Sequence, residues 1–283
     1  MNPTAAATKR SAVTFEEQAR GSSGVAFRAL LLRDLTVLRK SLSQSIPRTL
    51  IQPLLLVFVF TYVFPKIGQG VGVGRGGDAG YFSTLLTAGV VAIAILFQGI
   101  QAVALPLVQE FGYTKEIEDR VLATNATGNG AMEKVVAAAL QCLLAALLVF
   151  PIAAVVPATP VHLTIDWPVL LTLAPLACVM AAALGLTFGT LFEPRTVPLL
   201  FGVIIVPITF LGCVYYSWSA LKPIHWLQVL VLVNPLVYIS EGFRAALTNS
   251  SHMNLAAIYA VMLTFTALFL WRGIAGFKKR VLS

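Results

Sequence analysis

Long apolar runs alternate with short polar segments along most of this chain. Each run approaches or exceeds the roughly 20 residues that an α-helix needs to cross the hydrocarbon core of a bilayer. The pattern predicts six transmembrane helices, at about 48–65, 82–109, 135–156, 168–191, 197–214 and 255–272. We therefore expect an all-α integral membrane protein, with a transmembrane domain that covers residues 27–283.

A further apolar stretch, residues 215–247, does not fit a simple span. It is interrupted at Asn234-Pro235 and carries two charges, Glu241 and Arg244. A helix that breaks at proline inside a membrane is tolerated only where protein surrounds the freed backbone groups. We predict an extracellular re-entrant helical segment here, placed before the last span.

The region before the first span has two parts. Residues 1–26 are rich in Ala, Thr and Ser and predict a disordered cytoplasmic leader. Residues 27–47 place leucines at helical spacing opposite basic side chains. This pattern predicts an amphipathic helix that lies along the membrane interface.

Composition and charge support this interpretation. The chain is 58% hydrophobic and 11% charged, whereas soluble domains carry about 25% charged residues. With both termini placed in the cytoplasm, sixteen of the twenty Lys and Arg residues fall on the inner side. This positive-inside bias predicts the orientation and accounts for the net charge of +8 without nucleic acid.

Small residues predict where helices pack. Four of them recur at every fourth position of the fourth span: Ala177, Ala181, Gly185 and Gly189. Such a row lets another helix approach closely, either inside the subunit or between subunits. The three cysteines (Cys142, Cys178 and Cys213) fall inside apolar runs without metal-ligand spacing, so we expect packing roles for them.

The sequence lacks the residues that ion coupling, catalysis, metal binding and phosphate binding would require. The central parts of the spans carry no ionisable groups that could bind a coupling ion. No spaced set of carboxylates, Ser and His indicates a catalytic or metal site, and no GxxxxGK[ST] phosphate loop is present. We therefore expect a protein that is not an enzyme and that either takes energy from a partner or conducts passively.

The densest mixed-charge cluster lies between the second and third spans, in residues 110–131. Tyr113, Ile117 and Val121 recur at every fourth position and form one apolar stripe, with charged residues on the other faces. Thr124-Asn125 and 128–130 are predicted to end this helix. The pattern favours a docking surface for a soluble partner, and a solvated loop helix is the alternative.

These features together resemble the membrane subunit of ABC-2 type exporters. The resemblance is carried by the amphipathic helix, the six spans, the charged segment and the stretch "NPLVYISEGFRAAL" (234–247). The family includes drug and antibiotic-resistance, lipo-oligosaccharide and polysaccharide exporters. Many members have Thr-Pro where this chain has Thr124-Asn125.

The resemblance implies roles for named residues. In the family, the segment after the second span is the coupling helix that contacts an ATP-binding cassette subunit. The residues that it would contribute here are Glu110, Tyr113, Lys115, Glu116, Ile117, Glu118, Arg120, Val121 and Leu122. Asn234, Pro235, Glu241 and Arg244 would belong to the re-entrant segment that closes the transport path. Glu241 and Arg244 could form a structural pair or act in gating.

The resemblance also implies an assembly. Two copies of a separate ATPase, which would hold ATP and Mg²⁺, would join a homodimer of this chain or a pair with a similar permease. No cofactor is expected in this chain itself. The complex would lie among the lipids of the bacterial plasma membrane, with the transport path at the permease dimer interface.

The substrate is the least determined property. Phe58 and Tyr62 share one face of the first span, and with Gln98 they are candidates to line the path. Phe outnumbers Trp and Tyr in the spans, which favours a hydrophobic or amphipathic cargo such as a drug-like molecule or lipid. Alternatives are a lipid-linked glycan, a passive channel or scaffold without an ATPase, and Phe side chains that only face lipid or core. The direction of transport also stays open.

Overall fold

The protein is a bundle of long helices with one short buried helix at one end. The computed structural model describes residues 51, 55, 58–63, 66, 79–110, 127–155, 163–192, 196 and 201–281, and every regular element among them is a helix. The long helices are α3 (Ala79–Gln109), α5 (Thr127–Val155), α6 (Trp167–Leu191) and α11 (Leu255–Val281). The short ones are η1 (Phe58–Val63), η3 (Phe201–Ile205), α8 (Val206–Phe210), η4 (Trp218–Leu221), α9 (His225–Leu230), η5 (Val231–Val233) and α10 (Pro235–Leu247).

Four of the predicted spans are confirmed. The helices long and apolar enough to cross a membrane are Phe82–Gln109, Gly130–Ile152, Trp167–Leu191 and Leu255–Arg280. The all-helical prediction therefore holds for the described residues. The last span ends at Arg280, about eight residues beyond its predicted end. The predicted spans 48–65 and 197–214 are described only in part, so the count of six stays a prediction. The leader and the interface helix lie outside the described residues.

One predicted boundary is wrong. Residues 128–130 were expected to end the charged helix, but they form the first turn of α5, which begins at Thr127. Glycine is unfavourable in a helix interior, by up to about 1 kcal/mol. Ala131 and Val135, directly after this turn, are buried in a cluster with Leu107, Leu186 and Phe277. This packing extends the helix toward the charged segment despite the two glycines.

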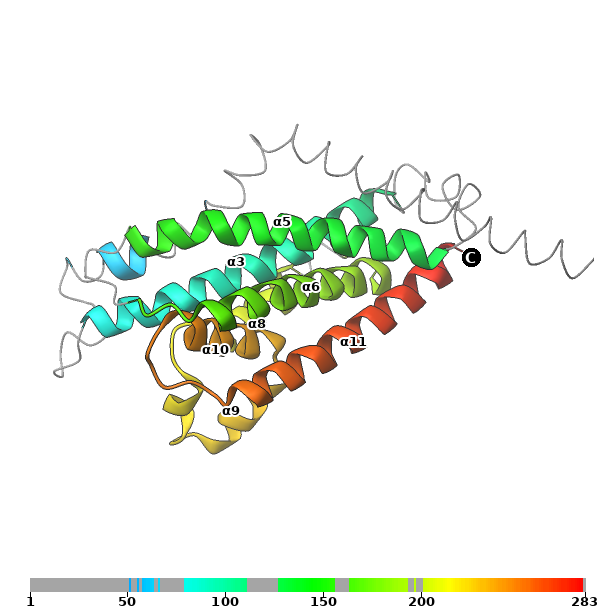
Figure 1. Ribbon diagram of the computed structural model, residues 1–283. Coiled ribbons are helices and arrows are strands. Elements are labelled where there is room, and N and C mark those ends of the chain that lie inside the picture. The colour runs from blue at the N-terminus through cyan, green and yellow to red at the C-terminus, as the bar shows by residue number, and fades with distance from the viewer. Residues whose placement is uncertain are drawn as a thin grey trace, which may run out of the picture.

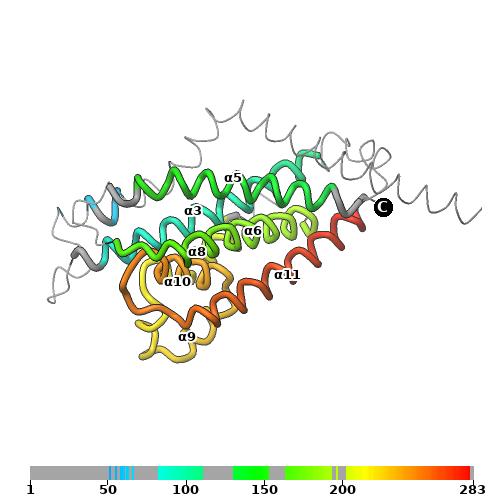
Figure 2. Tube along the Cα trace, viewed as in Figure 1, coloured from blue at the N-terminus to red at the C-terminus, as the bar shows by residue number. Residues whose placement is uncertain are grey.

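The long helices run side by side along one axis (Figures 1 and 2). The end of α3, the start of α5, the end of α6 and the end of α11 lie at the same end of the bundle, where the C-terminal residues are drawn. By the predicted orientation this is the cytoplasmic end. The opposite end holds α9 and α10.

Close packing of α3 on α6 forms the centre of the bundle. A Cβ added to Gly185 would lie 2.7 Å from the carbonyl oxygen of Gly99, and one added to Gly99 would lie 2.5 Å from the Ala181 Cβ. Gly189 faces Ala104 and Leu107 in the same way. The predicted small-residue row is thus confirmed as a packing surface, and it is used inside the subunit. Cys142, Cys178 and Cys213 are buried free thiols, as expected.

A second face of α6 packs against α11. Cβ atoms at Gly273 and Gly276 would meet the side chains of Leu186 and Thr190 at 2.8 and 2.7 Å. The Thr187 hydroxyl donates to the carbonyl oxygen of Phe269 at 2.9 Å. Because glycines lie at both contacts, α6 can approach α3 closely on one face and the last turns of α11 on the other.

The predicted re-entrant segment bends where the sequence indicated. The segment His225–Val233 and the helix Pro235–Leu247 meet at an angle of 98°. Asn234 lies at the bend, and its side-chain oxygen accepts from the backbone N–H of Leu236 at 2.9 Å, which caps α10. Pro235 occupies the first helical position, where its missing N–H costs nothing.

Candidate functional site

The short helix α10 is enclosed by the rest of the bundle. Its thirteen residues extend about 20 Å, which is too short to cross a hydrocarbon core of about 30 Å. Every residue of α10 except Ala245 is buried. Its last carbonyl groups are satisfied from outside the helix, because Ala246 O and Leu247 O accept from the backbone N–H groups of Asp166 and Thr164 at 2.8 and 3.1 Å.

Glu241 and Arg244 form a buried ion pair on α10. They lie one helical turn apart, and their side chains are 1% and 0% exposed. Arg244 Nη1 donates directly to Glu241 Oε1. A charge in this position is strongly unfavourable unless it is paired and hydrogen-bonded, so the further partners of each side chain decide what the pair can do.

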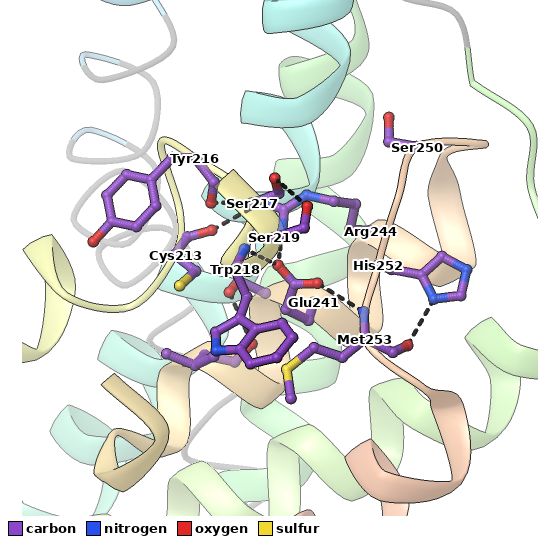
Figure 3. A network of polar contacts seen from close by, with 12 residues as sticks. Cys213, Tyr216, Ser217, Trp218, Ser219, Glu241, Arg244, Ser250, His252 and Met253 are labelled. Atoms are coloured by element: carbon purple, nitrogen blue, oxygen red, sulfur yellow. Dashed lines mark hydrogen bonds and ion pairs between the residues drawn. The ribbon is translucent and has the colours of Figure 1, made fainter. Parts of the chain in front are cut away.

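The Glu241 carboxylate joins two segments that are distant in the sequence. Its Oε1 accepts from the backbone N–H of Trp218 at 2.8 Å, and its Oε2 accepts from the backbone N–H of Met253 at 3.0 Å (Figure 3). Trp218 begins η4, and Met253 lies in the connection to α11. The carboxylate therefore holds both connections against α10.

The Arg244 guanidinium binds the turn that follows α8. Its Nη2 donates to the carbonyl oxygens of Cys213 and Tyr216, at 2.8 and 3.4 Å. Cys213 has a backbone φ of 52°, which is unfavourable for a residue other than glycine. A Cβ added to Gly89 on α3 would lie 2.4 Å from the Val214 carbonyl oxygen, so α3 packs closely on the other side of this turn. Packing by α3 and the hydrogen bond from Arg244 together hold Cys213 in its left-handed conformation.

Two more polar side chains of α10 and its cap bind carbonyls near the end of α8. The Asn234 amide donates to Ile208 O at 2.7 Å, and the Ser240 hydroxyl donates to Gly212 O at 2.6 Å. The last carbonyls of a helix have no partner within it. Asn234, Ser240, Glu241 and Arg244, with the backbone groups that they bind, are called the α10 hub below.

Tyr216 completes the turn beside the α10 hub. Its hydroxyl donates to the carbonyl oxygen of Phe210, the last residue of α8, at 3.0 Å. Burial raises the pKa of this hydroxyl, and the neighbouring Cys213 thiol adds to the shift. The group therefore stays protonated and acts as a donor well above neutral pH.

Sequence reasoning found part of the α10 hub. It singled out Asn234, Pro235, Glu241 and Arg244, and the structure brings them together with the turn after α8. It missed Ser240 and the backbone partners at 208, 212, 213, 216, 218 and 253. A serine in an apolar stretch carries no spacing signal, and backbone partners cannot be read from side-chain identity.

The predicted coupling residues fall mostly outside the described residues. This holds for Tyr113, Lys115, Glu116, Ile117, Glu118, Arg120, Val121 and Leu122. Glu110 is described, and its Oε1 lies 2.8 Å from Lys134 Nζ, with both side chains about 15% exposed or less. This ion pair joins the end of α3 to the second turn of α5, across the base of the charged segment.

The predicted path residues Phe58 and Tyr62 stack on each other. Their ring centroids are 5.2 Å apart, and Lys66 Nζ lies 4.6 Å from the Tyr62 ring and 3.2 Å from its hydroxyl. The shared face predicted for Phe58 and Tyr62 is thus confirmed, and Lys66 lies on the same face. Gln98 is half-buried on α3, directly before Gly99.

A second set of rings joins the first and fifth predicted spans. The Tyr215 ring lies 5.5 Å from that of Phe60 and 6.0 Å from that of Phe210. Phe210 is 60% exposed and Phe58 is 40% exposed. The two segments therefore present aromatic side chains on the surface of the subunit.

Comparison with known proteins identifies the family. The sequence profile of the ABC-2 type transporter family matches residues 25–248, well over half of the chain. The chain belongs to this family. The match includes the four side chains of the α10 hub and the whole charged segment, and it ends at Thr248, directly after α10.

Curated relatives of this ABC-2 permease match over a shorter stretch. The inner membrane transport permease YadH of Escherichia coli K12 is 35% identical over 66 residues, which is 23% of this chain and 25% of that permease. The same permease of Shigella flexneri matches with the same figures. The matched stretch spans about a quarter of the length of these relatives.

Family membership makes this ABC-2 permease the membrane subunit of an ABC transporter. Such a subunit works, in general, with an ATP-binding cassette partner that supplies the hydrolysis. The apolar helices and the inner membrane relatives support a multi-pass protein of the inner membrane.

Proposed function

We propose that this permease is the path-forming subunit of an ATP-driven exporter for a hydrophobic or amphipathic molecule, drug-like or lipid. Two copies of a separate ATPase, which bind ATP and Mg²⁺, energise two copies of the permease. Both termini of the permease lie in the cytoplasm. The ATPase contacts the segment that follows α3, and the α10 hub closes the path at the opposite end.

The observation that carries the cargo class is the exposed aromatic surface. Phe58 and Phe210 project from two segments that Tyr215 connects. Val206, on α8 with Phe210, and Val203, on the preceding η3, are 48% and 62% exposed. The only charged side chain among the described residues of 51–66 and 201–216 is Lys66, at the end of the first segment. Such a surface suits an apolar cargo better than a sugar, which would need polar partners beside the rings.

The ATPase contact is tested by co-purification from native membranes in mild detergent. Wild type is compared with Tyr113→Asp/Ile117→Asp and with the control Lys222→Asp/His225→Asp, which changes two exposed residues near the opposite end. We expect an ATP-binding cassette protein with wild type and control, and its loss with the first variant. Retention by all three would place the contact elsewhere, and absence from all three would refute the ATPase partnership.

The cargo and direction are tested in inside-out membrane vesicles supplied with ATP. Accumulation of a fluorescent amphipathic dye or phospholipid analogue in the vesicle lumen is the expected result for an exporter. Phe210→Ala should reduce this uptake several-fold, and Trp167→Ala, at another exposed aromatic position, should not. ATP-dependent uptake of a lipid-linked glycan alone would overturn the cargo class. Release of preloaded dye on ATP addition would overturn the direction.

A further inference from the structure

The last turns of α11 have two faces with different surroundings. One face is packed on α6, through Gly273 and Gly276 and through Phe277, which is 4% exposed. On this side Arg280 Nη2 donates to the Phe192 carbonyl oxygen at 2.6 Å, beyond the end of α6. Arg280 is therefore used to fix the end of α11 to α6.

The other face carries the remaining basic residues and a tryptophan. Its members are all exposed: Trp271, Arg272, Ala275, Lys278 and Lys279. Arg272 and Lys279 lie seven positions apart, as do Trp271 and Lys278, which places each pair about 10 Å apart along the same side of the helix. Ala275 lies between the two pairs. These five residues are called the α11 cradle.

The α11 cradle has the geometry of an anion site. The small side chain of Ala275 leaves space between the Arg272–Lys279 pair and the Trp271–Lys278 pair, which together carry three basic side chains. The Arg272 guanidinium lies 6.0 Å from the Trp271 ring, close enough for a cation–π contact. No acidic residue occurs anywhere on α11, and its last turn carries Lys278, Lys279 and Arg280. Among the described residues the cradle side chains are not covered by another element, so their charges face outward.

The position of the α11 cradle along the helix matches the headgroup layer. α11 has 27 residues, or about 40 Å, and a hydrocarbon core is about 30 Å thick. Apart from Thr264, the exposed residues of α11 before the cradle are apolar, and include Leu263 and Leu268 at 57% and 45% exposure. Tryptophan is enriched at the boundary between acyl chains and headgroups, so Trp271 marks that boundary and the basic side chains follow it.

We infer that the α11 cradle binds the headgroup of an anionic phospholipid. Arg272 supplies the planar fork of donors that suits phosphate oxygens. Lys278 and Lys279 supply two flexible charges, and Trp271 packs on the start of the acyl chains. The predicted cytoplasmic end assigns the lipid to the inner leaflet. Because Arg280 bonds the same helix end to α6, the bound lipid anchors α6 and α11 together at the membrane surface.

The test uses tryptophan quenching by brominated lipids in nanodiscs without any ATPase. The full-length protein is placed in phosphatidylcholine nanodiscs with increasing shares of brominated phosphatidylglycerol, or of brominated phosphatidylcholine as the neutral control. The signal of Trp271 is the difference between wild type and Trp271→Phe. We expect it to be quenched at a lower share of phosphatidylglycerol than of phosphatidylcholine, and the preference to weaken as salt rises.

Variants distinguish a specific lipid site from the general attraction of basic residues to an anionic membrane. The share of phosphatidylglycerol for half-maximal quenching should rise about fivefold for each basic side chain removed in Arg272→Ala, Lys278→Ala and Lys279→Ala. Lys222→Ala, near the other end of the molecule, should leave it unchanged. Thermal unfolding in neutral nanodiscs checks that each variant is folded. Equal quenching by both lipids in wild type would overturn the inference, as would variants that keep the lipid preference and lose only co-purification of an ATPase.

Discussion

Gly99 of α3 and Gly185 of α6 face each other across a close helix contact in the centre of the described bundle. A Cβ at Gly185 would lie 2.7 Å from the Gly99 carbonyl oxygen and 2.9 Å from the Ile100 Cα. Both obstacles are backbone atoms, which cannot rotate away as a side chain can. The contact joins the helix that leads into the charged segment to the helix that α11 also packs against.

Gly185→Ala should therefore destabilise the protein by roughly 1–3 kcal/mol, the usual cost of overpacking a core. Gly130→Ala on α5 is the matched control, because nothing lies within 4 Å of its added Cβ. That change should be neutral or stabilising by up to about 1 kcal/mol, since alanine favours the helix. Thermal unfolding in detergent, followed by a dye that reacts with the buried thiols as they become exposed, measures both. Equal stability of the two variants would contradict the packing argument.

Glu241→Gln should destabilise the α10 hub strongly, by about 3–5 kcal/mol, because it leaves the buried Arg244 charge without its partner. Asp166→Asn, a change of the same chemistry at an exposed position, should cost less than about 1 kcal/mol. The same unfolding assay measures the difference.

Transport measurements distinguish the two roles, structural and gating, that the sequence left open for the Glu241–Arg244 pair. A structural pair predicts that transport falls only as far as the amount of folded protein falls. A gating role predicts a Glu241→Gln protein that is folded at low temperature but leaks dye from vesicles without ATP. A Glu241→Gln variant as stable as wild type would contradict the importance of the pair.

Asn234 should contribute to the stability of the protein through two hydrogen bonds, and different substitutions can separate their effects. Asn234→Ala removes the cap of α10 and the donor to Ile208 O, and should cost about 1–3 kcal/mol. Asn234→Ser keeps a capping oxygen but is too short to replace the bond to Ile208, so its cost should be intermediate. If Asn234→Ser unfolds together with wild type, the bond to the end of α8 contributes nothing measurable.

The Glu110–Lys134 ion pair should matter for coupling as well as for stability. Both side chains are about 15% exposed or less, so Lys134→Met, which removes the partner of a largely buried carboxylate, should lower the free energy of unfolding by about 1–3 kcal/mol. ATP-dependent transport should fall several-fold, because the pair closes the base of the segment that the ATPase is proposed to move. The exchanged pair Glu110→Lys/Lys134→Glu should recover part of the transport. No recovery, together with wild-type ATPase binding, would show that the pair itself is not what transmits the movement.

Local patterns predicted most of the secondary structure that the bundle is built from. Four apolar runs became the four confirmed spans, and Asn234-Pro235 marked the bend of 98°. These predictions succeeded because span length, proline chemistry and helix capping depend on neighbouring residues. The start of α5 was mispredicted because Ala131 and Val135, directly after its glycines, pack with Leu107, Leu186 and Phe277 from other segments.

The candidate site was predictable in its charged members and not in their partners. Glu241 and Arg244 stand out in any apolar sequence, and their spacing on one turn indicated a pair. Sequence spacing could not indicate that the carboxylate would also bind the backbone at Trp218 and Met253, or that the guanidinium would bind Cys213 O. Those backbone groups become available only when helix ends and turns from three segments meet.

The sequence by itself determined that this chain is a helical membrane protein, where four of its spans lie, and that glycines would allow close packing. Hydrophobic length and the absence of charge dictate this, because a bilayer excludes unpaired polar groups whatever the fold. Only the tertiary structure decided that the small-residue row packs inside the subunit, against α3. It also decided that a short helix with two buried charges ties the turn after α8 to the start of α11. Such contacts depend on which distant segments come within hydrogen-bonding distance of each other, about 3 Å.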